Sequence, residues 1–181
     1  MNPFHTALAE LQTVTDALDL AAVAEASGLI AEAGRIVAYG CGREGLQLAG
    51  FVMRLHHLGL RAAMQGDMAA PPLGAGDLFI CSAGPGELAT VTALMRVAQA
   101  AGADILFLTA VPGSEAAGLA SHVLTIPAQT MADDTAGFSA LPMGSLYEGA
   151  MFLLFEVMVL DLRDRLAVAP DTMRARHTNM E

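Results

Sequence analysis

The stretch from Leu78 to Thr92 reads as a buried strand, a glycine turn and the start of a helix, and it limits the possible folds more than any other segment. Its turn is Ala83-Gly84-Pro85-Gly86, and Glu87 follows where a carboxylate suits the positive end of a helix dipole. A second strand, residues 35–39, leads into a similar turn, Gly40-Cys41-Gly42-Arg43-Glu44-Gly45. Such units place backbone N–H groups around an anion or a polar ligand. Two of them predict one shared pocket at the carboxyl ends of the strands.

The rest of the chain alternates strand and helix patterns, which predicts an α/β fold with a parallel sheet of about five strands covered on both faces. The expected strands are residues 36–39, 61–64, 78–82, 104–109 and 122–126. The expected helices are two within residues 2–33, divided near Asp19 and ended by Gly34, then 46–58, 87–101, 114–120, 143–166 and a short one from Pro170. Residues 127–142 show no periodic pattern and predict a long loop, which in a compact domain is often functional.

The chain has 181 residues, a length that favours one domain with a substantial core. Apolar residues make up 54% and the mean hydropathy is +0.50. No uninterrupted apolar run reaches the roughly 18 residues of a membrane span, so membrane binding is not expected. The helix over 143–166 is apolar nearly all round, which places it in the core and in an interface between subunits.

The charge balance narrows the classes of function. The formal net charge is −10, with nine arginines and no lysine. This argues against nucleic-acid binding, which needs a basic face, and it rules out a catalytic lysine. Cys41 and Cys81 are too few for a disulfide framework and indicate packing. Because the first residues lack the pattern of a signal peptide, we expect a cytoplasmic protein.

Five segments have the character of family motifs: residues 40–45, 51–59, 83–88, 142–148 and 176–181. They resemble motifs of the SIS (sugar isomerase) family, and in particular of its 6-phospho-3-hexuloisomerases. Residues 40–45 resemble the family's GAGRSG turn, and residues 83–88 stand where the family has SGSGET. Residues 51–59 resemble its FAMRLMHLG helix. The specific matches are Pro142-Met143-Gly144-Ser145-Leu146-Tyr147-Glu148, which is similar to PMGSLFE, and residues 176–181, which are similar to the C-terminal RHANLE. The resemblance covers essentially the whole chain.

The resemblance implies a single SIS domain over residues 1–181, folded as a flavodoxin-like three-layer αβα sandwich. It implies a homotetramer or homodimer with shared active sites. The implied reaction converts D-arabino-hex-3-ulose 6-phosphate to fructose 6-phosphate through an enediol, without metal or organic cofactor. Glu148 is then the candidate base, and His177 of a neighbouring subunit is its acid/base partner. The candidate contacts to the sugar or sugar phosphate are Gly42, Arg43, Glu44, His57, Ser82, Gly84, Gly86, Glu87 and Ser145.

The sequence departs from the family at its phosphate cradle. The positions that carry hydroxyl side chains in the family hold Ala83, Pro85, Leu88 and Glu44. Pro85 also removes a backbone N–H donor. Glu44 would repel a dianionic phosphate unless it is protonated or paired with Arg43.

Three functions fit these residues. In the first, the chain isomerises an unphosphorylated or differently substituted sugar, and Glu44 would accept hydrogen bonds from the hydroxyls of that sugar. Alternatively it is a phosphosugar isomerase that uses backbone N–H groups, Arg43 and a helix dipole. A non-catalytic SIS module that binds a sugar-like ligand is the third, and the presence of both Glu148 and His177 argues against it. Without the resemblance, Glu148 would be an ordinary first-turn residue and His177 a solvated terminal side chain.

Overall fold

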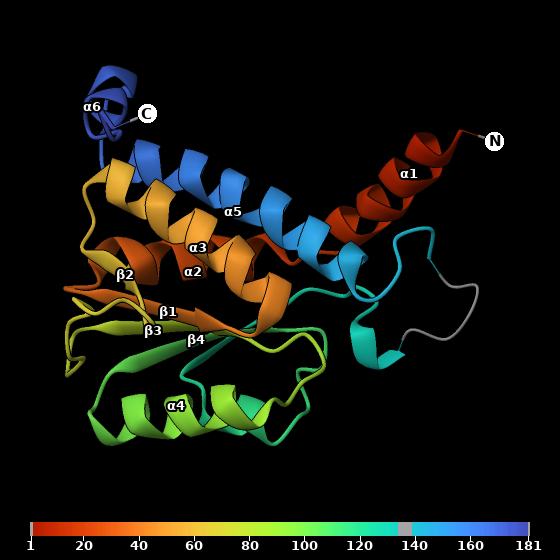
Figure 1. Ribbon diagram of the computed structural model, residues 1–181, viewed down its shortest axis with the longest axis horizontal. Coiled ribbons are helices and arrows are strands. Elements are labelled where there is room, and N and C mark those ends of the chain that lie inside the picture. The colour runs from red at the N-terminus through yellow and green to blue at the C-terminus, as the bar shows by residue number, and fades with distance from the viewer. Residues whose placement is uncertain (1, 134–138, 181) are drawn as a thin grey trace.

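A five-stranded parallel sheet forms the centre of the computed structural model, which describes residues 2–133 and 139–180 (Figure 1). The strands are β1 (Ile36–Gly40), β2 (Ala62–Met64), β3 (Leu78–Ser82), β4 (Asp104–Thr109) and β5 (His122–Thr125), in the spatial order β2-β1-β3-β4-β5. β1 and β3 are neighbours, and Gly40 pairs with Ser82 at their ends. The two glycine turns therefore start side by side at the carboxyl edge of the sheet, as the sequence predicts.

Helices cover both faces of the sheet (Figure 1). One face carries α2 (Leu20–Glu32) and α3 (Gly42–Leu58), and α5 (Ser145–Arg165) packs over both of them, with α1 (Pro3–Asp16) against α5. The other face carries α4 (Ala89–Ala100) and the 3-10 helix η1 (Ala116–Leu119). The short α6 (Pro170–Ala175) packs against α3. This arrangement confirms the predicted α/β fold with helical layers on both sides.

Alternation along the strands divides the core into two parts. Ile36 and Ile80 point into the larger core under α3 and α5, whereas Val37 and Cys81 point into the smaller core under α4. Phe51 of α3 stacks on Phe155 of α5, with ring centroids 4.3 Å apart and planes within 6°. This contact fixes the two helices against each other, and their first turns both reach the carboxyl edge of the sheet.

Several element boundaries differ from the prediction. α3 begins at Gly42 and not at residue 46, because the glycine turn over residues 40–45 is already helical after Cys41. α4 begins at Ala89 and not at residue 87, because Leu88 is extended, with φ −136° and ψ 124°. Glu87 therefore lies before the helix and not in its first turn. Gly34 does not form a left-handed cap, since α2 ends at an extended Ala33.

One further prediction is corrected in part. The long segment 127–142 contains the 3-10 helix η2 (Met131–Asp133), while its residues 134–138 lie outside the described residues. α5 is buried along the side that faces α2 and α3, as predicted, and its other side exposes Phe152, Val157 and Leu160 by 53–55% in the single chain. In residues 2–133 and 139–180, no helix combines the length and apolar character needed to cross a membrane.

Candidate active site

A cavity of about 450 Å³ lies at the carboxyl edge of the sheet. Four segments line it: the start of α3, the turn after β3, the region of η2 and the start of α5. The lining residues are Cys41, Gly42, Arg43, Glu44, Pro85, Leu88, Thr130, Met131, Met143, Gly144, Tyr147 and Glu148. Ligands of open parallel sheets bind at this edge, beyond the strand ends.

Arg43 joins the first turn of α3 to the first turn of α5. Its Nε lies 3.0 Å from Oε2 of Glu148, its Nη1 donates to Ser145 Oγ at 2.9 Å, and its Nη2 donates to the carbonyl oxygen of Met143. A guanidinium has five N–H donors in a rigid fork. Three of these donors bond to residues at or just before the start of α5.

Glu148 is the more enclosed member of this ion pair, with a side chain only 15% exposed. Burial raises the pKa of its carboxyl, the nearby Arg43 guanidinium opposes that rise, and the negative charge of Glu44 adds to it. A carboxylate whose pKa moves toward neutrality makes a better general base, because it holds an abstracted proton more firmly. Glu148 thus has the position and the environment of an acid/base group.

Glu44 turns away from Arg43 and bonds to the strand β3. Its Oε2 accepts a hydrogen bond from Ser82 Oγ at 2.5 Å, and both carboxylate oxygens accept from the Gly84 N–H, at 3.1 and 3.2 Å. Ser82 Oγ also lies 3.2 Å from the Tyr147 hydroxyl. Burial raises the pKa of the Glu44 carboxyl, while the bonds from Ser82 and Gly84 lower it. The Glu44 carboxylate is therefore bonded to Ser82 and Gly84, while Arg43 pairs with Glu148.

The backbone before α5 has an unusual conformation. Met143 and Gly144 both have positive φ, 56° and 81°. A Cβ on Gly144 would lie 3.1 Å from the backbone nitrogen of Met131, so this position favours glycine for space as well as for its dihedral angle. A non-glycine residue in this region is uncommon and is often held at a functional site. Here it presents the Met143 carbonyl oxygen to Arg43.

The remaining predicted contacts lie around the cavity or away from it. Ser82 is fully buried and does not line the cavity, and its hydroxyl bonds to the Glu44 carboxylate, which does. Gly84, Gly86 and Glu87 belong to the turn beside the cavity, and a Cβ on Gly86 (φ +94°) would lie 2.8 Å from Val111 Cβ. Glu87 is exposed.

His57 and His177 lie together, but far from Glu148. Their rings stack at a centroid distance of 5.2 Å, and both line a separate cavity with Arg54, Arg163, Pro170, Met173 and Arg174. That cavity is at the other end of α5, whose 21 residues place its ends about 30 Å apart. Within one chain, His177 therefore does not reach the cavity of Glu148.

Sequence reasoning did not identify Tyr147, Thr130 and Met131 as site residues. Tyr147 is almost fully buried, and burial together with the charge of Glu44 raises the pKa of its hydroxyl. Its position next to Glu148 in the matched motif was the available signal. Thr130 and Met131 belong to the long segment that was expected to be functional, but no residue pattern within it singled them out.

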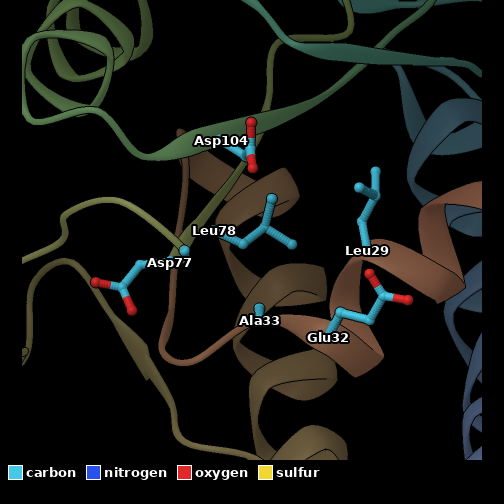
Figure 2. Close-up of a pocket in the computed structure, with 7 residues that line it drawn as sticks. Leu29, Glu32, Ala33, Asp77, Leu78 and Asp104 are labelled. Carbon is cyan, nitrogen blue, oxygen red and sulfur yellow. The ribbon is translucent and has the colours of Figure 1, made fainter.

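A separate cavity at the opposite edge of the sheet is lined by several acidic side chains. Leu29, Glu32, Ala33, Asp77, Leu78 and Asp104 line it together with Gly76, and Figure 2 shows its carboxylates pointing in different directions. Asp77 is bound by Arg35, whose Nη2 lies 2.7 Å from Oδ2. Among the described residues, no group of three or more His, Cys, Asp or Glu side chains is placed to hold a metal ion. The acidic cavity thus lacks the convergent ligands of a cation site.

Known proteins are similar to this chain over most of their length. The family model for the SIS domain matches residues 29–147. A 3-hexulose-6-phosphate isomerase of Mycobacterium gastri is 37% identical over 152 residues, covering 84% of this chain and 76% of the relative. A 3-hexulose-6-phosphate isomerase of Methylomonas aminofaciens is 34% identical over 155 residues, covering 84% of both chains.

Solved structures agree on the fold. A hypothetical protein from Methanococcus jannaschii, whose crystal structure led to an inferred function of 3-hexulose-6-phosphate isomerase, superposes with a TM-score of 0.86 at 19% identity, covering 100% of both chains. The sugar isomerase domain of a transcription factor from Sphaerobacter thermophilus gives a TM-score of 0.74 at 18% identity, covering 96% of this chain and 92% of that one. Since the family model spans most of the chain and the sequence relatives are isomerases, this chain belongs to the SIS domain family and is an isomerase of that family.

Proposed function

We propose that the chain isomerises a sugar by moving a proton between adjacent carbons, with Glu148 as the base. The observation that carries the proposal is the position of Glu148, which lines the cavity and is largely buried, and whose carboxylate pairs with a guanidinium. The raised pKa of the Glu148 carboxyl supports the same role. An isomerase that works through an enediol needs such a base next to donors for two oxygen atoms.

The reaction is written here for a 3-ketose. Glu148 takes the proton from C2, and O3 gains a proton, giving a 2,3-enediol. The proton then returns to C3, O2 loses its proton, and the product is the 2-ketose. Arg43 contributes in two ways, because it orients the Glu148 carboxylate and keeps two N–H donors for the oxygens that gain charge.

The names of the relatives suggest the first substrate to test. Relatives from Mycobacterium gastri and Methylomonas aminofaciens are 3-hexulose-6-phosphate isomerases. For this chain we propose a substrate with a hexulose skeleton and a reaction that transfers a proton between C2 and C3. The non-catalytic alternative has less support, because it gives no reason for an enclosed carboxylate clamped by Arg43 inside a cavity.

The site is proposed to be completed by a second copy of the chain, as a homodimer or homotetramer. His177 is at the far end of α5 from Glu148, so it would act only at the cavity of another subunit. Large apolar side chains on the outer side of α5, and Phe4 and Leu8 of α1, are exposed in the single chain. Such a surface resembles the interfaces of obligate oligomers.

The direct test follows proton transfer itself. The purified chain is incubated in D₂O with 3-hexulose 6-phosphate and, separately, with the same sugar without its phosphate, and NMR detects deuterium at the carbon that receives the proton. The variants are then compared on the sugar that the unmodified chain converts. We expect Glu148→Gln to lower turnover by about 10²–10⁴-fold. The matched control is Glu156→Gln on the same helix, which changes the same charge at a partly exposed pair with Arg54. Equal turnover by the Glu148→Gln variant and the unmodified chain would remove Glu148 from the mechanism.

A further inference from the structure

The turn after β3 has no free donor for an anionic ligand within residues 83–86. The N–H of Ala83 donates to the Leu108 carbonyl oxygen at 3.1 Å, and the N–H of Gly86 donates to Ala83 at 2.9 Å. Pro85 has no N–H. The N–H of Gly84 donates to the Glu44 carboxylate. None of the four side chains carries a hydroxyl, so residues 83–86 offer a phosphate no hydrogen bond.

The Glu44 carboxylate takes the place that an external anion would need. It bonds to both the Gly84 N–H and the Ser82 hydroxyl, two donors that converge at the end of β3. The fit is close, because a Cβ on Gly84 would lie 3.2 Å from Glu44 Oε1 and 3.1 Å from Tyr147 Cε1. Because Gly84 has no side chain, there is space for the Glu44 carboxylate beside it.

The charges that line the cavity also disfavour a phosphate at this turn. Among the described residues that line the cavity, Glu44 and Glu148 are acidic and Arg43 is the one cation, already bound to Glu148. A dianionic phosphate beside Glu44 would meet a carboxylate that no cation neutralises in the described residues. Like charges at contact distance repel more strongly in a partly buried site than in water, because the effective dielectric constant is lower there.

We propose that Glu44 determines substrate specificity: its carboxylate is a built-in anion at the turn after β3, so this end of the cavity receives a sugar hydroxyl and rejects a phosphate. The inference rests on the proposed isomerase function. A carboxylate has about four acceptor positions, and the bonds from Ser82 and Gly84 leave capacity for a hydroxyl donor on the ligand. The substrate class is thus a ketose or aldose that is not phosphorylated at the end bound here.

The test compares phosphate binding by the unmodified chain and by Glu44→Gln, using inorganic phosphate and fructose 6-phosphate as probes in calorimetric titrations. The glutamine keeps the shape of the side chain and removes its charge. We expect Glu44→Gln to bind both probes at least about tenfold more tightly than the unmodified chain. The control is Glu32→Gln, an equal change of charge on an exposed residue at the opposite edge of the sheet, which should bind as the unmodified chain does. Equal affinity of the unmodified chain and Glu44→Gln for both probes would overturn the proposal.

A second measurement needs no variant and covers the case in which Glu44→Gln does not fold. The value of kcat/KM is measured on the unmodified chain for 3-hexulose 6-phosphate and for the same sugar without its phosphate. We expect the unphosphorylated sugar to be used at least as well. A clear preference for the phosphorylated sugar would contradict the role of Glu44 and leave the isomerase function intact. Failure of the isomerase function is distinct, since neither sugar would then exchange a proton with solvent, while the phosphate titrations would still test Glu44.

Discussion

Arg43 Nε and Glu148 Oε2 lie 3.0 Å apart, although 105 positions separate the two residues in the chain. The pair connects the first turns of α3 and α5, which the stacked Phe51 and Phe155 hold together further along the helices. The guanidinium lowers the pKa of a carboxyl that burial raises. The position of the ion pair therefore sets the pH range in which Glu148 is an ionised base.

Replacement of Arg43 by methionine tests this balance. Without the guanidinium, the pKa of Glu148 should rise further, because its opposing cation is lost while burial and the Glu44 charge remain. Since the base must be ionised, the acidic limb of the pH profile of kcat/KM should move to higher pH, and turnover should fall about tenfold or more. Arg165→Met, at the other end of α5, is the matched control. An acidic limb that stays in place would show that Arg43 does not tune Glu148.

Mixing two inactive variants tests whether sites are shared. Glu148→Gln and His177→Gln should each lower turnover strongly, because each removes one acid/base group. After subunit exchange in an equal mixture, a dimer with shared sites should recover about a quarter of the unmodified turnover, since half the dimers are mixed and each has one intact site. A mixture no more active than its parts would place both groups in one subunit or remove His177 from the site.

Alanine substitutions at Gly84 and Gly50 compare a position with close neighbours and one with open space around the new Cβ. Gly84→Ala places a Cβ 3.1–3.2 Å from Tyr147 and Glu44, so the Glu44 carboxylate must shift. We expect it to lower the free energy of unfolding by about 1–3 kcal/mol and to reduce turnover. Gly50→Ala, within α3 and with no atom within 4 Å of the new Cβ, should raise the free energy of unfolding by about 0.5–1 kcal/mol. Denaturant unfolding measures both changes, and similar effects at the two positions would contradict the packing around Gly84.

Asp77 supports the fold at the edge opposite the candidate active site. Arg35 Nε and Nη2 donate to its carboxylate at 3.1 and 2.7 Å, and the Gly74 N–H donates at 2.9 Å. Hydrogen bonds from Arg35, assisted by its charge, lower the pKa of Asp77 in spite of burial. Asp77→Asn should therefore reduce the free energy of unfolding by about 1–3 kcal/mol at neutral pH.

The stabilisation of the fold by the Asp77 carboxylate should decrease as the pH falls. A pKa lowered by folding gives a stabilisation that is present above the unfolded pKa and is lost as the pH falls through the folded value. The difference between the unmodified chain and Asp77→Asn should thus shrink in acid. Asp164→Asn, at an exposed pair with Arg163, is the control and should change stability little. A difference that is constant with pH would mean that the Asp77 charge does not stabilise the fold.

The sheet was predictable because its signals are local. Short apolar runs identified all five strands, and the glycine turns after two of them identified the edge that carries the cavity. The helix starts were less accurate, since the position of Gly42 inside α3 and of Glu87 outside α4 depends on how each turn closes against the neighbouring strand. Such closure involves residues that are distant in the sequence, and no short pattern records it.

The central charged residues of the candidate site were predictable, but their partners were not. Glu148, Arg43 and Glu44 were identified from the sequence, and all three line the cavity. Their partners follow from the packing of α3 on α5, which places Arg43 beside Glu148 and sends Glu44 to Ser82 and Gly84. The same packing buries Tyr147, for which the only signal in the sequence was its position next to Glu148 in the matched motif.

The wide spread of the cavity's lining along the chain has a consequence for folding. Its residues begin at Cys41 and end at Glu148, so the cavity is built from contacts of high sequence separation, which form late because their loop-closure entropy must be overcome first. During synthesis, the ribosome would have to release α5 before the site exists. A ligand that binds only the finished cavity stabilises only the completed chain, and it would not rescue a truncated product that stops before α5.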